Sequence, residues 1–230
     1  MTKNNNFVLE TKDLCKSYTQ GNENYEILKD VNFSLSKGEV LGLIGPSGSG
    51  KTSLLNILGM LDTPSSGEVY INGVETSGMK DSQKTKLRGE NIGFVFQFHH
   101  LFQDFTSLEN VMFPLRIQGV NSVIAKQKAL YILEKMGLQD RLNNYPSQLS
   151  GGEQQRVSIA RAIVFNPKIL IADEPTGNLD QENAQKVFNM LLELVSSYGI
   201  SIILATHDTN IASQIPKKIK IENKNLVNFS

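Results

Sequence analysis

An eight-residue segment near position 50 has the spacing that proteins use to hold phosphate groups. It matches G-x-x-x-x-G-K-[ST] throughout and consists of Gly45, Pro46, Ser47, Gly48, Ser49, Gly50, Lys51 and Thr52. Glycines let successive backbone N–H groups face a phosphate, and the lysine reaches its outer oxygens. Apolar residues 40–44 predict a buried strand before it, and 53–60 predict a helix after it. The segment therefore predicts a nucleoside triphosphate site, with Thr52 on Mg²⁺ and Ser53 beside the nucleotide.

Two adjacent acids follow another apolar run and suit phosphate hydrolysis. Residues 169–172 are all apolar and predict a buried strand, which Asp173 and Glu174 close. An unpaired charge at the end of a buried strand is costly, so the pair predicts a functional site. We expect Asp173 to bind Mg²⁺, usually through water. We expect Glu174 to accept a proton from the attacking water as the general base.

A second anion-binding helix start is predicted near residue 150. Ser150 suits the N-cap position and Glu153 stands three residues later, which is the spacing of a capping box ahead of the helical stretch 157–163. Capping does not require Gly151 and Gly152, whose small size lets the backbone approach a ligand closely. A helix N-terminus that carries serine and glycine predicts a second anion site.

The elements that must position these groups alternate between strands and helices in the last third of the chain. Buried-strand runs at 169–172 and 200–205 flank an amphipathic helix. Its apolar positions are Ala184, Val187, Leu191 and Leu194. This order predicts an α/β fold with a parallel sheet and helical crossovers. Helical spacing also occurs between 125 and 136, whereas segments near the start predict antiparallel strands at 7–14, 31–36 and 69–72.

The composition indicates a globular chain without a membrane span of its own. Its 230 residues include 23 Lys and Arg against 23 Asp and Glu, and this neutrality argues against a protein that coats nucleic acid. The apolar runs are far shorter than the ~20 residues that a bilayer requires, and the polar start at 1–6 predicts no signal peptide. Cys15 is the single cysteine, so an internal disulfide is impossible. We expect a soluble cytoplasmic chain whose membrane role comes from a partner.

The segment 150–154 resembles the signature of ATP-binding cassette (ABC) ATPases, and other motifs of that family occur in order. The resemblance runs from about residue 7 to the end. It implies a P-loop NTPase fold in a single cassette over 1–230. A RecA-like core with an N-terminal antiparallel β subdomain would occupy 1–97 and 166–230, and an α-helical subdomain would occupy 98–165.

The resemblance also implies roles for single residues. Tyr18 stands where the family has an aromatic ring that stacks on adenine, and 178–180 resembles the D-loop, in which Asp180 would couple two ATP sites. Gln97 resembles the Q-loop glutamine, which contacts Mg²⁺ and reports on a transmembrane partner. His207 resembles the switch histidine, which stabilises the γ-phosphate and the attacking water.

Family members form head-to-tail homodimers that hold two ATP molecules. In such a dimer, Ser150, Gly151, Gly152 and Glu153 of one copy would close on the γ-phosphate that Lys51 of the other copy holds. The two predicted anion sites in this chain agree with that arrangement.

A narrower resemblance involves the ATPase subunits of lipoprotein-releasing systems, through residues 97–106 and 108–111. It implies two permease subunits, a peripheral position on the cytoplasmic face of the inner membrane, and outer-membrane lipoproteins as cargo. The segment 173–180 is shared with macrolide-export and cell-division relatives, which remain alternatives. A soluble ABC ATPase acting on nucleic acid or ribosomes fits the length and neutrality poorly. Phe102 and Phe105 would either dock the partner's coupling helix or belong to the helical core.

Overall fold

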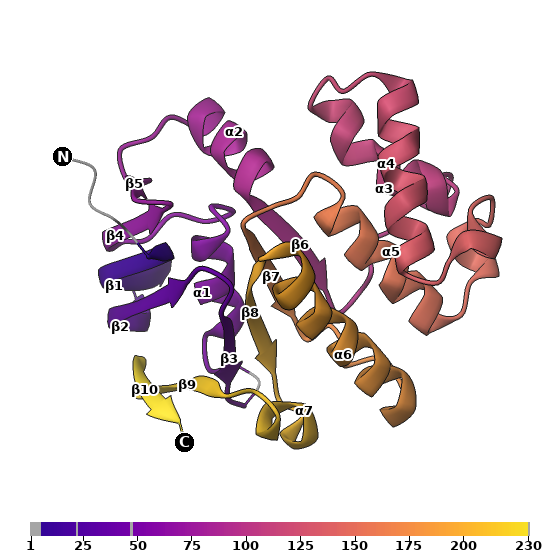
Figure 1. The fold of residues 1–230 in the computed structure, drawn as a ribbon. Coiled ribbons are helices and arrows are strands. Elements are labelled where there is room, and N and C mark those ends of the chain that lie inside the picture. Colours follow the sequence, from indigo (N-terminus) through magenta and orange to yellow (C-terminus); the bar gives the residue numbers. More distant parts are fainter. Residues whose placement is uncertain (1–5, 22, 47, 230) are drawn as a thin grey trace.

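Two β-sheets form the framework of the molecule (Figure 1). The computed structural model describes residues 6–21, 23–46 and 48–229. The larger sheet has the order β10-β9-β3-β8-β7-β6, and the smaller one β2-β1-β4-β5. The strands are β1 (Phe7–Gln20), β2 (Glu23–Ser36), β3 (Val40–Ile44), β4 (Ser66–Ile71), β5 (Val74–Glu75), β6 (Ile92–Phe96), β7 (Ile169–Asp173), β8 (Ser201–Thr206), β9 (Lys217–Glu222) and β10 (Asn225–Phe229).

The helices that lie between β6 and β7 along the chain gather at the end of the molecule opposite the small sheet (Figure 1). The helices are α1 (Lys51–Leu58), α2 (Asp81–Asn91), α3 (Ser107–Ile117), α4 (Ser122–Lys135), α5 (Gly151–Ile163), α6 (Gln181–Tyr198) and α7 (Thr209–Ser213), with two 3₁₀ turns, η1 (Gln139–Arg141) and η2 (Pro146–Gln148). Helix α3 packs against both α4 and α5. In the part of the chain that the structure describes, no helix combines the length and the apolar character needed to cross a bilayer.

The larger sheet is parallel where the sequence predicts it to be. Strand β8 pairs in parallel with β3 on one side and with β7 on the other, and β6 pairs in parallel with β7. Consecutive parallel strands need crossover connections, and α6 supplies the one between β7 and β8. All four strands therefore end at the same edge of the sheet.

Alternation along the buried strands divides the core into two. Leu170, Ala172 and Leu204 face a cluster that includes apolar residues of α3 to α6. Ile171 and Ile203 face the opposite cluster, which includes residues of α1, β1 and β2. Because both faces of these strands are covered, residues 169–172 and 202–205 are apolar at every position rather than at every second one.

The small sheet is antiparallel, as expected from the early segments. Strands β1 and β2 are longer than the predicted strands at 7–14 and 31–36, and their pairing contains several register shifts. One shift falls between Thr11 and Leu14. Each shift exchanges the inward and outward faces of a strand, which explains why the alternation in 7–14 is imperfect.

Candidate active site

A cavity of about 480 Å³ lies where β3, β6, β7 and β8 end. The order of the strands places their last residues in a row along one edge of the sheet, which is where open α/β sheets bind ligands. The lining residues come from that edge, from α1 and from β2, and they are Ile27, Gly48, Gly50, Lys51, Thr52, Ser53, Gln97, Asp173, Glu174 and His207.

The loop before α1 has the backbone conformation of a phosphate cradle. Gly48 and Gly50 have φ angles of 77° and 101°, in the region that favours glycine. A Cβ at Gly50 would also lie 3.0 Å from Cγ2 of Ile27. Among the described residues, no side chain caps α1, so its first N–H groups stay available to an anion. Ser47 lies outside the described residues, so its predicted contact stays a prediction.

Lys51 and Ser49 show that this loop suits a ligand. Nζ of Lys51 is buried and donates hydrogen bonds to the carbonyl oxygens of Gly45 and Pro46, at 2.7 and 3.0 Å. The hydroxyl of Ser49 is buried without a hydrogen-bond partner among the described residues. Buried polar groups normally have partners, so the loop offers an unused donor and a cation to a phosphate.

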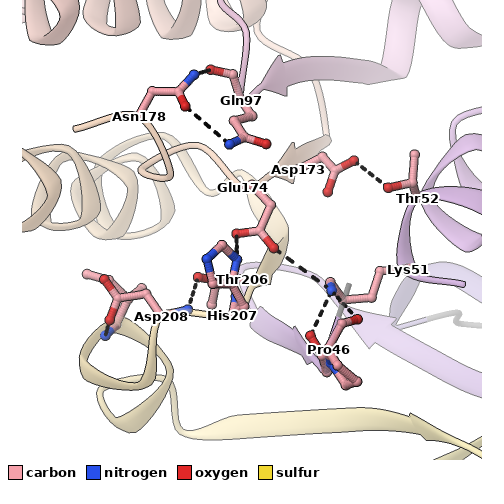
Figure 2. Close-up of polar contacts among 12 residues, drawn as sticks. Pro46, Lys51, Thr52, Gln97, Asp173, Glu174, Asn178, Thr206, His207 and Asp208 are labelled. Atoms are coloured by element: carbon pink, nitrogen blue, oxygen red, sulfur yellow. Dashed lines mark hydrogen bonds and ion pairs between the residues drawn. The ribbon is translucent and has the colours of Figure 1, made fainter. Parts of the chain in front are cut away.

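Asp173 and Glu174 point into the cavity in different directions (Figure 2). Oδ2 of Asp173 accepts a hydrogen bond from Oγ1 of Thr52 at 3.0 Å. Burial raises the pKa of Asp173, and the charge of Glu174 acts in the same direction. Oε2 of Glu174 lies 2.8 Å from Nδ1 of His207, and Oε1 lies 3.9 Å from Nζ of Lys51. Glu174 thus lies between a cation and a histidine.

The backbone at Glu174 is strained. Its φ angle is 50°, which is uncommon for a residue with a side chain. The N–H of Glu174 donates a hydrogen bond to the carbonyl oxygen of Ala205 at 3.0 Å. The carbonyl oxygen of Glu174 accepts one from the N–H of Gly177, also at 3.0 Å. These bonds hold the carboxylate at the end of β7, and strain of this kind is concentrated at functional sites.

Gln97 follows β6 and is joined to Asn178 by two hydrogen bonds (Figure 2). Nε2 of Gln97 donates to Oδ1 of Asn178 at 3.2 Å, and Nδ2 of Asn178 donates to the backbone carbonyl of Gln97 at 3.0 Å. The predictions included Gln97 but gave Asn178 no role, since nothing in the sequence relates two positions 81 residues apart. Ile27 was also missed, because a single apolar residue in a strand carries no signal.

Hard oxygen donors in the cavity fit the predicted Mg²⁺. The Thr52 hydroxyl, the Asp173 carboxylate and the Gln97 amide all line it. Among the described residues, no group of three His, Cys, Asp or Glu side chains could hold a metal. Magnesium is commonly bound by one or two protein ligands together with substrate phosphates and water, so this sparse donor set is suitable.

The predicted capping box near residue 150 is present. Oγ of Ser150 accepts from the N–H of Glu153 at 3.3 Å, and Oε2 of Glu153 accepts from the N–H of Ser150 at 2.8 Å. Glu153 also forms a 2.8 Å ion pair with Arg141. Gly152 is buried, and a Cβ there would lie 3.3 Å from Oδ1 of Asn183.

Several predicted ligands stay outside the cavity of a single chain. The described residues that line it do not include Gly45, Pro46, Ser49, Tyr18, Asp180 or the residues from Ser150 to Glu153. Asp180 caps α6 by accepting from the N–H of Asn183 at 3.0 Å. The hydroxyl of Tyr18 donates to Asp62 at 2.9 Å, and Nζ of Lys16 lies 4.6 Å from the centre of its ring. Their roles toward nucleotide remain predictions.

Known proteins resemble this chain over almost its whole length. Residues 28–177 match the family described as "ABC transporter". The chain is 45% identical to the lipoprotein-releasing system ATP-binding protein LolD of Buchnera aphidicola, over 98% of this chain and 99% of that protein. It is 45% identical to LolD of Legionella pneumophila strain Paris, over 96% and 98%.

Solved structures show the same fold. The chain superposes on the dimeric ATP-binding cassette MJ0796, bound to ADP and Pi in a post-hydrolysis state, with a TM-score of 0.88 and 38% identity, over 96% of this chain and 98% of that one. A second dimeric structure of MJ0796 gives a TM-score of 0.87 at 40% identity, over 95% of this chain and 96% of that one.

Proposed function

Because this chain belongs to the ABC transporter family and is the ATP-hydrolysing subunit of such a transporter, we propose that it drives the release of lipoproteins from the inner membrane. One observation supports the site residues above all. A phosphate-loop lysine, two adjacent carboxylates and a histidine, from three distant stretches of sequence, converge on one cavity at the sheet edge.

Each group in the cavity has a task in hydrolysis. Lys51 exchanges its carbonyl partners for the β- and γ-phosphate oxygens of ATP. Glu174 orients the attacking water and takes its proton, while His207 steadies the carboxylate and the γ-phosphate. Thr52, Asp173 and Gln97 would hold Mg²⁺. When bound, the ion neutralises charge on the β- and γ-phosphates.

The complete site requires a second copy of the chain, arranged head to tail. The N-terminus of α5, with Ser150 and Gly152, is a capped helix start outside the cavity of its own chain. In the proposed homodimer it reaches the γ-phosphate bound by the other copy, and its free N–H groups favour that negative charge. Tyr18 would stack on adenine, and Asp180 would link the two sites across the interface.

An apolar groove of about 400 Å³ supports the proposal that this chain binds a membrane protein. It lies between the ends of α2, α3 and α5 and the strand β6, and it includes Leu61, Phe94, Phe102, Phe113, Pro114 and Ile117. The side chain of Ile117 is 70% exposed, and an exposed apolar surface of this kind is typical of interaction sites. We propose that a coupling helix of a permease subunit fills it, which would place the chain on the cytoplasmic face of the membrane.

Phe102 lies at this groove, whereas Phe105 packs beside Phe102 without lining the groove. Phe102 lines it, is 41% exposed and packs on Phe113 at 4.5 Å between ring centres. Phe105 is half-buried and packs on the same ring at 5.8 Å. The amide of buried Asn110 fixes the segment between them, since it bonds to backbone atoms of Phe102 and Phe105. The arrangement suits a docking surface at Phe102, with Phe105 as its support.

Affinity purification from membranes tests the proposal. We expect the chain to retain two transmembrane subunits and to promote ATP-dependent release of lipoproteins from membranes that contain them. The Glu174→Gln variant should assemble normally but release none. A partner that governs a peptidoglycan hydrolase, or a macrolide pump subunit, would assign the chain to another ABC complex. Recovery without any membrane subunit would refute the transport role.

A further inference from the structure

We propose that Asn178 is a positioning residue that fixes the orientation of the Gln97 amide, so that its oxygen faces the Mg²⁺ position. The inference rests on the proposed nucleotide site and adds to it a residue that does not itself line the cavity. It concerns the two hydrogen bonds between these residues, which join the loop after β6 to the turn after β7.

The orientation of a glutamine amide decides whether it can bind a cation. Its oxygen attracts a metal, whereas its NH₂ group repels one. In this chain Nε2 of Gln97 donates to Oδ1 of Asn178, so the amide nitrogen has a partner on the side away from the cavity. Figure 2 shows the side chain of Gln97 between Asn178 and Asp173, with its nitrogen on the Asn178 side. The oxygen is left for the cavity that Thr52 and Asp173 line.

Asparagine is suited to this position because it can donate and accept at once. Its NH₂ group holds the backbone carbonyl of Gln97 while its oxygen holds the side chain, so one residue fixes both ends of the glutamine. Aspartate would keep only the acceptor, and alanine would lose both bonds. The orientation is therefore set by hydrogen bonding rather than by packing alone.

Gly177, which precedes Asn178, independently supports a fixed position for the Gln97 amide, because it leaves room for that amide to approach the backbone. A Cβ at Gly177 would lie 3.0 Å from Nε2 and 3.3 Å from Cδ of Gln97. The φ angle of Gly177 is not in the left-handed region, so the backbone conformation does not explain the glycine there. The space that the glycine leaves is the space that the Gln97 amide occupies.

Titration of Mg²⁺ against binding of a fluorescent ATP analogue tests the inference without relying on turnover. The chain carries Glu174→Gln to prevent hydrolysis, and the affinity for the analogue is measured in EDTA and across a Mg²⁺ series. We expect Asn178→Ala to raise the Mg²⁺ concentration for half-maximal enhancement by roughly 10–100-fold, as is usual when a residue that orients a metal ligand is lost. Affinity in EDTA should stay unchanged. Asn178→Asp, which keeps the acceptor but loses the bond to the Gln97 carbonyl, should recover only part of the loss.

Gln214→Ala provides a matched control. Gln214 and Gln185 form an equivalent exposed amide pair, at 2.9 and 3.0 Å, and neither is among the described residues that line the cavity. This variant should titrate like the parent. An unchanged Mg²⁺ midpoint in Asn178→Ala would overturn the inference, as would an equal loss of affinity with and without Mg²⁺, which would indicate a merely structural role.

Asp173→Asn separates this inference from the proposed function. If Asp173→Asn shifts the Mg²⁺ midpoint and Asn178→Ala does not, the metal site stands and the positioning role fails. If the parent itself shows no gain in affinity from Mg²⁺, the proposed site fails and the inference fails with it.

Discussion

Two nitrogen atoms of His207 lie close to the same carboxylate oxygen of Glu174. Nδ1 of His207 lies 2.8 Å from Oε2 of Glu174, and the backbone N–H of His207 points to the same oxygen at 3.4 Å. The Glu174 side chain is 14% exposed and that of His207 is 64% exposed. A proton on Nδ1 thus faces the carboxylate.

Replacing Glu174 by glutamine should lower the rate of ATP hydrolysis by about 10²–10⁴-fold, because the general base is lost while the shape of the side chain is kept. Binding of ATP should persist, and steady-state phosphate release measures the effect. Glu182→Gln is a suitable control, since Glu182 is an exposed residue of α6 that pairs with Lys186. Near-normal turnover in Glu174→Gln would remove this residue from the mechanism.

Replacing His207 by alanine should slow hydrolysis by about 100-fold, because Glu174 loses its nearest hydrogen-bond donor and the γ-phosphate loses a stabilising group. The effect should fall on the maximal rate rather than on ATP affinity, since Lys51 and the glycine loop remain intact. Single-turnover and binding measurements separate the two. His100→Ala, outside the cavity lining, should leave ATP affinity unchanged, and an equal loss of affinity in His207→Ala would contradict the assignment.

Phe102→Ala should weaken assembly with the membrane subunits while basal ATP hydrolysis persists. Truncating an aromatic anchor at an interface typically costs about 2 kcal/mol or more. Val74→Ala changes a similarly exposed residue on β5 and should have no effect. Co-purification from membranes is the measurement. If Phe102→Ala and Phe105→Ala both retain the full complex, the aromatic cluster belongs to the helical core and not to a docking surface.

Stability should depend on pH through Glu153. The backbone N–H of Ser150 is the main reason that the pKa of Glu153 is lowered, and Arg141 adds to it. The ionised carboxylate therefore stabilises the folded chain above its ordinary pKa of 4.5, and this contribution is lost as pH falls through the lowered folded pKa. Glu153→Gln should cost roughly 0.5–1 kcal/mol near pH 7 and progressively less in acid. Urea unfolding across pH checks this, and a constant difference at all pH values would contradict it.

The sequence predicted best those parts that depend on local patterns. The phosphate loop, the capped start of α5 and the buried strands β7 and β8 lie within a few residues of where they were expected. Each has a local cause, namely glycine spacing, a capping pair or an unbroken apolar run. Such patterns do not depend on what packs against them.

Other parts depend on contacts that no local pattern reveals. None of the residues of α2, all of which the structure describes, is buried, so this helix has no apolar periodicity to detect. The predictions left out β9 and β10, although Ile219 and Ile221 alternate with charged residues in β9 as in a half-buried strand. The pairing of Gln97 with Asn178 arises only when β6 and β7 lie side by side.

The position of β8 has a consequence for how this protein folds during its synthesis on the ribosome. Strand β8 is synthesised after β3 and β7, yet it lies between them and pairs with both. Neighbouring strands are ~4.8 Å apart, so without β8 a gap of about 10 Å would separate the strand of the lysine from that of the two acids. A nascent chain that stops before residue 201 holds the lysine and both acids but lacks the strand that pairs with both of theirs. The cavity of a single chain therefore forms late, when β8 inserts as the last parallel strand of that edge.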